Sequence, residues 1–109
     1  MQYKKGVLPM IHSELIILAK EIHEKILEKI EKKEGFNFIL YSEQTEVCMK
    51  FIPEYITVSD DIYEISDGID SSIHIKNKEV THIYKEGDDI DGVLYSISFK
   101  NGTQMIIIL

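Results

Sequence analysis

The stretch from Tyr84 to Gly92, YKEGDDIDG, is the one best suited to chemistry, because it holds four acidic residues and two glycines. This composition is typical of calcium loops of the EF-hand type, whose sixth residue is glycine. If Gly92 takes that position, the first and twelfth positions fall on Gly87 and Ser98, which offer no carboxylate ligand. A strand pattern also follows where an EF-hand needs a helix. The spacing therefore excludes an EF-hand and favours the tip of a connection between strands, with glycines supplying the turn.

Other arrangements of metal ligands in the sequence are weak. His74 and His82 lie on candidate strands joined by a short turn at Asn77-Lys78, but no third ligand accompanies them, and zinc takes three or four protein ligands. A carboxylate site built from neighbouring loops is left as a minor alternative, in which the chain would be a metal-dependent enzyme. That alternative would use Asp60, Asp61, Asp88 and Asp89. The leading prediction is that the chain holds no metal and no cofactor.

No catalytic constellation is evident. Cys48 lies within a candidate strand between Val47 and Met49, without a glycine-rich elbow or a helix N-terminus to lower its pKa, so we expect a packed, inert thiol. Phosphate-binding, dinucleotide-binding and zinc-protease motifs are missing from the sequence. The prediction is a protein that is not an enzyme.

Charge is distributed unevenly along the 109 residues. The formal net charge is -7, and residues 59–92 carry all of that excess, with ten acidic residues against three lysines. The 12 basic residues are all lysines, so the chain lacks the guanidinium groups that form bidentate hydrogen bonds with phosphates and guanine. Direct binding to nucleic acid or to an anionic membrane is therefore disfavoured. A single cysteine, no secretory leader and no long apolar run predict a cytoplasmic protein.

An acidic segment in a small chain without catalytic residues suits an inhibitor. We expect an immunity-type protein that neutralises a basic partner, such as a nuclease toxin, by covering its cationic site. Acidic turns would supply the contacts, and two tyrosines would act as aromatic anchors. The predicted partner surface consists of Asp60, Asp61, Tyr63, Asp67, Asp70, Tyr84, Glu86, Asp88, Asp89 and Asp91.

Several other functions stay open. The principal alternative is a homodimeric structural domain or a domain that binds a small ligand, with the apolar last strand or the apolar face of the helix as the dimer interface. A phage-type inhibitor of a host nucleic-acid-binding complex predicts the same acidic surface, and solubility alone also explains acidic turns.

The elements that must position these residues begin with a long helix from about residue 10 to 34. Its apolar residues recur at helical spacing and form a single stripe. The stripe is Ile11, Leu15, Leu18, Ala19, Ile22, Ile26 and Ile30. Pro9 or Ser13 suits the helix start, and Gly35 suits its end.

After Gly35 the apolar period changes from 3.6 to 2, which predicts strands. Eight stretches qualify: 36–42, 45–52, 54–59, 61–66, 71–77, 79–85, 92–100 and 103–109. Residues 43–44 fit a two-residue turn that sets Leu40 opposite Val47. Asn101-Gly102 is a favoured turn pair and would set Ile97 opposite Ile106 and Tyr95 opposite Ile108.

The last strand is apolar on both faces, so an internal layer or a second subunit must cover it. Together the elements predict one α+β domain spanning residues 1–109. Its long N-terminal helix would pack on an antiparallel, meander-like sheet of about six or seven strands that ends in a C-terminal hairpin. The sequence leaves open whether that sheet divides after Pro53.

Overall fold

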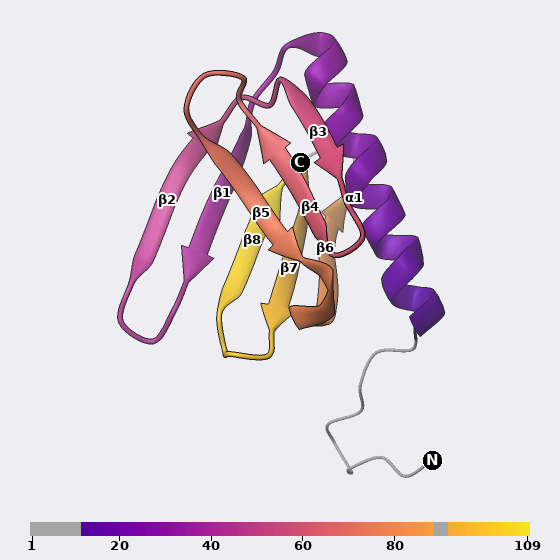
Figure 1. Cartoon of the computed structure of the whole chain (residues 1–109), viewed down its shortest axis with the longest axis vertical. Coiled ribbons are helices and arrows are strands. Elements are labelled where there is room, and N and C mark those ends of the chain that lie inside the picture. Colours follow the sequence, from indigo (N-terminus) through magenta and orange to yellow (C-terminus); the bar gives the residue numbers. More distant parts are fainter. Residues whose placement is uncertain (1–11, 89–91) are drawn as a thin grey trace, which may run out of the picture.

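The computed structural model describes the backbone of residues 12–88 and 92–109, and the side chains of 15–87 and 92–109. One helix is followed by eight strands and a short 3-10 turn (Figure 1). In chain order they are α1 (His12–Lys32), β1 (Phe36–Tyr41), β2 (Glu46–Phe51), β3 (Tyr55–Val58), β4 (Ile62–Ser66), β5 (Ser72–Lys76), η1 (Asn77–Glu79), β6 (Val80–Asp88), β7 (Gly92–Phe99) and β8 (Gln104–Ile108). The α+β class is confirmed, and each of the eight candidate stretches forms a strand, slightly more than the six or seven expected.

The strands form two antiparallel sheets instead of one. The larger has the order β2-β1-β8-β7-β6, and the smaller has the order β3-β4-β5. Pro53, buried between β2 and β3, has no N–H to donate, so it is suited to the point where the chain leaves the first sheet. The next residue begins the second sheet, because the Glu54 N–H donates to the Ser66 carbonyl at 2.7 Å.

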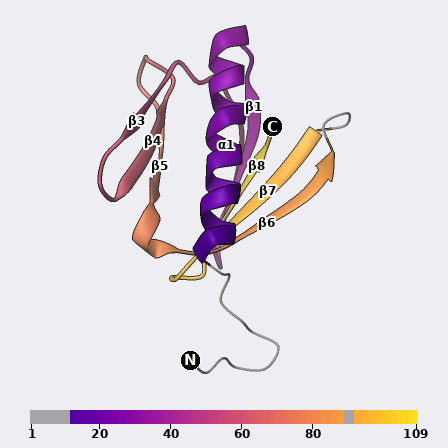
Figure 2. The same cartoon turned by 90° about the vertical axis from the view of Figure 1, so that its right-hand side faces the viewer.

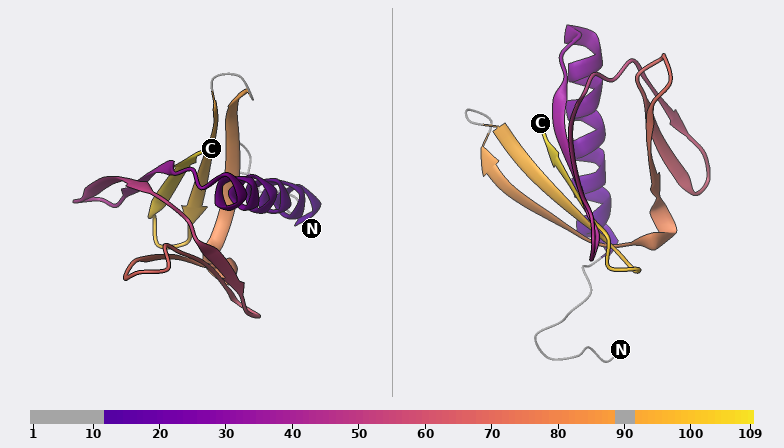
Figure 3. Two further views of the ribbon diagram at one scale, coloured as in Figure 1. Left: turned by 90° about the horizontal axis from the view of Figure 1, so that it is seen from above. Right: turned by 90° about the vertical axis from the view of Figure 1, so that its left-hand side faces the viewer.

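Helix α1 and the three-stranded sheet lie on the same side of the five-stranded sheet (Figures 2 and 3). The core between them is formed mainly by alternate residues of the strands and by Ile22 and Ile26 of α1. Its fully buried members include Ile26, Ile65, Tyr95 and Ile107. Of the predicted helix stripe, Leu15, Leu18 and Ile30 pack against this core, whereas Ala19 is exposed and Ile11 lies outside the described residues.

The helix ends three residues before Gly35. Lys33 adopts the left-handed conformation, with φ of 57°. Its N–H donates to the Ile30 carbonyl at 3.2 Å, and the Glu34 N–H donates to the Lys29 carbonyl at 2.9 Å. This is the pairing of a Schellman cap. Gly35 does not cap the helix but allows close packing against β2, since a Cβ there would lie 3.0 Å from the Phe51 carbonyl oxygen.

The first hairpin has the predicted register, with Leu40 opposite Val47. The C-terminal hairpin does not: Tyr95 pairs with Ile107 and Ile97 with Met105, one residue away from the prediction. The reason is a three-residue loop, closed by the Phe99 N–H donating to the Thr103 carbonyl at 3.0 Å. Gly102 is the left-handed residue of that loop, with φ of 87°. The shift by one residue exchanges the faces of β8.

Strands β5 and β6 belong to different sheets, so Asn77-Lys78 does not close a hairpin. The two residues begin the 3-10 turn that carries the chain from one sheet to the other. His74 and His82 are therefore separated by this crossover. Cys48 is exposed on the edge strand β2, so the expectation of a packed thiol is wrong. Desolvation and the nearby Glu46 carboxylate nevertheless raise the pKa of Cys48, which keeps the thiol protonated.

Candidate functional site

The predicted acidic surface is distributed over three places. Asp60 and Asp61 lie between β3 and β4, and Asp67 and Asp70 lie between β4 and β5. Because these turns join opposite ends of β4, the two pairs flank the three-stranded sheet instead of meeting. Glu86 lies near the end of β6, across α1 from that sheet (Figure 2). The Asp88 side chain, Asp89 and Asp91 lie outside the described residues.

Asp67 stabilises its own turn, and Asp61 ties the turn between β3 and β4 to η1. The Oδ1 of Asp67 accepts the N–H groups of Ile69, Asp70 and Ser71 at 2.8–3.1 Å. These bonds hold the pKa of Asp67 below its usual value, because they favour the charged carboxylate. Asp61 accepts the Lys78 N–H through Oδ1 at 3.2 Å, and its carbonyl accepts the Asn77 N–H at 2.7 Å.

The two predicted tyrosine anchors differ in exposure. Tyr84 is 54% exposed on β6. Tyr63 is half-buried, and its hydroxyl lies 2.9 Å from the Nδ1 of His23 on α1. Burial raises the pKa of Tyr63 well above its ordinary value, so it stays a neutral phenol. Tyr63 therefore joins the helix to the three-stranded sheet.

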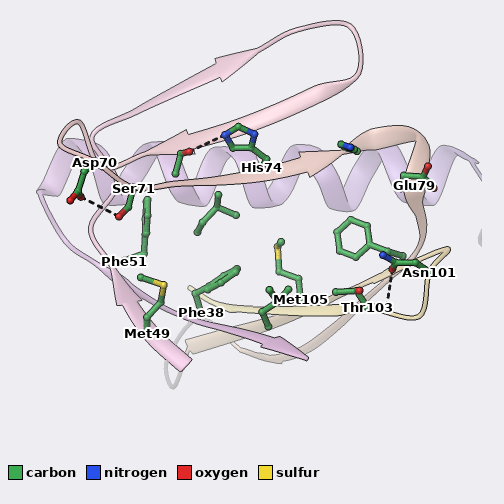
Figure 4. A pocket seen from close by; sticks show the side chains of 15 residues that line it. Phe38, Met49, Phe51, Asp70, Ser71, His74, Glu79, Asn101, Thr103 and Met105 are labelled. Carbon is green, nitrogen blue, oxygen red and sulfur yellow. Dashed lines mark hydrogen bonds between the residues drawn. The ribbon is translucent and has the colours of Figure 1, made fainter. Parts of the chain in front are cut away.

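The side chains of β5 and of the five-stranded sheet instead enclose a cleft of about 860 Å³. Ile73 of β5 lines one wall, and Phe38, Phe51 and Met105 line the facing sheet (Figure 4). These four side chains are almost fully buried. Met49, on the edge strand β2, also lines the cleft and is 42% exposed. The cleft thus has an apolar middle and an apolar side chain that solvent reaches.

Polar groups gather at both ends of this cleft. Asp70 and Ser71 lie at one end, where the Ser71 hydroxyl donates to the Asp70 carboxylate at 3.2 Å (Figure 4). Glu79, Asn101 and Thr103 lie at the other end (Figure 4). Carboxylates and neutral hydrogen-bonding groups are therefore available at both ends to orient a molecule whose middle contacts apolar groups.

His74 and Lys76 complete the lining on β5. The Nε2 of His74 lies 2.7 Å from a Glu64 carboxylate oxygen and 2.9 Å from the Ser72 hydroxyl. This nitrogen is engaged by groups of the same sheet, which fixes the orientation of the ring. Among the described residues, no three histidine, cysteine or acidic side chains come together as metal ligands do.

A second apolar cavity of about 640 Å³ lies between α1 and both sheets. Its lining includes Leu15, Ile22, Tyr63, Ile83 and Ile97. Neither this cavity nor the cleft was predicted from the sequence. Their walls come from strands far apart in the sequence, and alternation of apolar residues indicates a buried face without showing what lies opposite.

Comparison of the sequence with protein-family models and with curated proteins gave no match. Among solved structures, the chain is similar to the crystal structure of ChuX, with a TM-score of 0.52 and 13% sequence identity. The similarity covers 82% of this chain and 58% of that chain, so this chain spans little more than half of that protein. At this identity the likeness concerns the fold alone. In the part of the chain that the structure describes, no helix has the length and apolarity needed to cross a membrane.

Proposed function

We propose that this chain is a non-catalytic binding domain that holds a small, elongated, mostly apolar molecule in the cleft between β5 and the five-stranded sheet. The observation that carries the proposal is the cleft itself, about 860 Å³ in volume, apolar in its middle and polar at both ends. Ligand sites are commonly ~300–1,000 Å³ clefts lined by apolar and aromatic side chains with a few polar groups.

Burial of the walls explains how such a site would bind. The aromatic rings of Phe38 and Phe51 are only 6% and 3% exposed, so they form a preformed back wall of which little surface is open, and Met49, at 42% exposure, offers a ligand more apolar surface. Each methylene that moves from water into the cleft would contribute about 0.8 kcal/mol. Met49 is unbranched and adaptable, which suits a side chain at an entrance.

Methyl NMR tests this directly, because two of the four methionines, Met49 and Met105, line the cleft. The probes would be a medium-chain fatty acid, the corresponding fatty alcohol, a fused-ring dye and a flat tetrapyrrole, which separate chain from ring and charged from neutral ends. A ligand of the cleft is expected to shift both methyl signals in a saturable manner. If no probe class shifts either signal at millimolar concentration, the proposal is wrong.

A pair of tryptophan variants distinguishes the cleft from the second cavity. Leu40 lines the cleft and Val58 lines the cavity beside α1. Leu40→Trp is expected to weaken binding at least tenfold by filling the cleft, while Val58→Trp leaves it within about twofold. The reverse order would assign binding to the second cavity and refute this site. Circular dichroism checks that both variants keep the fold.

The inhibitor of a basic protein is a second candidate, favoured by the concentration of the net charge in residues 59–92. It predicts a one-to-one complex that weakens with salt. Because the acidic turns are separated, reversal at the exposed Asp60 together with Asp61 should act independently of reversal at Glu86. A pull-down from the native cell with the wild type and both variants tests it, and capture that is unaffected by salt and charge reversal would refute it.

A further inference from the structure

The inference concerns the face of the five-stranded sheet that points away from α1 and the three-stranded sheet, called here the outer face. Its apolar centre consists of Ile39 on β1, Leu94 on β7, and Ile106 and Ile108 on β8. Pairing places Ile106 between Ile39 and Ser96, and Ile108 between Asn37 and Leu94. The amide of Gln104 on β8 donates to the Ser96 hydroxyl at 3.0 Å, which confirms that β7 and β8 present these side chains to the same side.

This apolar centre has no cover among the described elements. The four side chains are only half-buried and are not among those that form or pack against the core. Figures 2 and 3 show α1 and the three-stranded sheet on the opposite side of the sheet. Strand β8, which lies in the middle of the sheet, is thus apolar on both faces and covered on one. Central strands of this kind are normally covered on both sides.

The rim of the outer face carries opposite charges at opposite ends of the same row. One row runs from Lys50 on β2 through Asn37, Ile108 and Leu94 to Glu86 on β6. Another row runs from Glu46 on β2 to His82 on β6, through residues of the same three inner strands. These rim side chains are all exposed. With histidine counted as neutral, these four rim side chains carry a net charge of only about -1, a small part of the -7 of the chain.

We infer that a second copy of this chain covers the outer face, related by a two-fold axis along β8. Rotation about this axis exchanges the two edges of the sheet, so β2 of one copy lies over β6 of the other. Lys50 then faces Glu86 of the second copy as an opposite-charge pair, and Glu46 faces His82, whose ring N–H can donate to a carboxylate, so the face is complementary to itself. Elsewhere the acidic segment would make two copies repel, whereas here they meet where the net charge is small.

The size of the face sets the strength of this dimer. Five strands at ~4.8 Å and three rows at about 7 Å give an area near 500 Å² per copy, or about 1,000 Å² in all. That is the lower end for a specific interface, so we expect dissociation in the micromolar range. Sheets packed face to face twist by about 30° relative to each other, which separates their corners and favours the long side chains found at this rim.

Sedimentation equilibrium with charge reversal tests the inference. The wild type is expected to dimerise over the micromolar range. Lys50→Glu and Glu86→Lys are each expected to weaken the dimer about tenfold, because each pair occurs twice in the dimer, and the double variant is expected to recover to within about twofold. A wild type that stays monomeric at high micromolar concentration, or single and double variants that behave alike, would overturn the proposal.

Cross-linking tests the direction of the axis. Cys48 and Tyr84 occupy the two ends of the middle row. In Tyr84→Cys, the introduced thiol should lie near Cys48 of the second copy. A short bis-maleimide would then link two chains, although it cannot span the roughly 19 Å across one sheet. Tyr84→Cys with Cys48→Ser is the matched control and should stay uncross-linked. Efficient cross-linking of the wild type through Cys48 alone would place β2 against β2 and refute this axis.

Discussion

A hydrogen bond between Tyr95 and Glu21 links helix α1 to the five-stranded sheet. The Tyr95 hydroxyl donates to the Glu21 carboxylate at 2.5 Å, from a side chain that is 0% exposed. The other carboxylate oxygen accepts from the Lys85 Nζ at 2.9 Å. Tyr95→Phe removes the hydroxyl and keeps the ring in the core, so it isolates this bond from packing.

The expected cost follows from the charge and the exposure of the partner. A hydrogen bond to a charged group contributes about 1.5–3 kcal/mol to stability. The Glu21 side chain is 33% exposed, so water and Lys85 partly replace the lost donor. We therefore expect Tyr95→Phe to lower the free energy of unfolding by about 1.5 kcal/mol, the lower end of this range. This corresponds to a fall in Tm of about 5–10 °C for a chain of this size. Lys85→Met, which removes only an exposed ion pair, should cost about 0.5 kcal/mol.

The pH dependence provides an independent check. The Tyr95 bond is the main reason that the pKa of Glu21 lies below its ordinary value of 4.5. A group whose pKa is lowered by folding stabilises the fold fully above its unfolded value and loses that contribution as the pH falls through its folded value. The stability difference between wild type and Tyr95→Phe should therefore be largest at neutral pH and shrink below about pH 4.

Urea unfolding of wild type, Tyr95→Phe, Glu21→Gln and the double variant forms a cycle that measures the coupling. In the Glu21→Gln background, where the acceptor is neutral, the effect of Tyr95→Phe should fall to about 0.5–1 kcal/mol. If the two single effects simply add, or if the cost of Tyr95→Phe is the same at pH 3 and pH 7, the bond is not the link described above.

Three further predictions concern local features of the fold. Gly87→Ala should lower the free energy of unfolding in urea by at least about 2 kcal/mol, because φ is 97° and the new Cβ would lie 2.5 Å from the Gly92 carbonyl oxygen. Gly102→Ala should lower it by only about 1 kcal/mol, because φ is 87° but no atom lies within 4 Å of the new Cβ. Equal losses in the two variants would contradict this reasoning. Asp67→Ala should lower the urea midpoint at neutral pH, and lower it by less as the pH falls below 3.8, since the pKa of Asp67 is lowered by the bonds it accepts; a loss that does not change with pH would contradict the turn assignment. Ile26→Ala should cost about 3 kcal/mol by calorimetry because the side chain is 0% exposed, whereas Ile17→Ala, at 65% exposure, should cost less than about 1 kcal/mol.

The local elements could be predicted from the sequence because their causes are local. Helical spacing of apolar residues placed α1, alternation placed most strands, and the turn at Asn101-Gly102 placed the last strand, which is apolar on both faces. Residues 43–44 fixed the register of the first hairpin, because its short turn leaves a single way to pair. The same reasoning failed at Asn101-Gly102. That pair also fits a three-residue loop with Gly102 left-handed, and only the pairing with β1 and the burial of Tyr95 and Met105 select that loop.

The candidate site could not be predicted, because the cleft depends on which elements face each other. Alternation in β5 shows that Ile73 is buried, and alternation in β1 shows the same for Phe38, but neither pattern says that these two side chains line one cleft. The acidic residues of the predicted partner surface lie in separate places for the opposite reason. Its residues are neighbours in the sequence, and the turns at the two ends of β4 carry them apart.

By itself, the sequence determined that the last strand is apolar on both sides and that something must cover each side. Only the tertiary structure decided that α1 and the three-stranded sheet cover one side, with Ile107 fully buried, while Ile106 and Ile108 stay on the outer face. The physical reason is that hydrophobic periodicity is a property of one segment. Contact between two buried faces depends on both segments that meet. Here it depends on where the chain passes from one sheet to the other, at Pro53 and at η1.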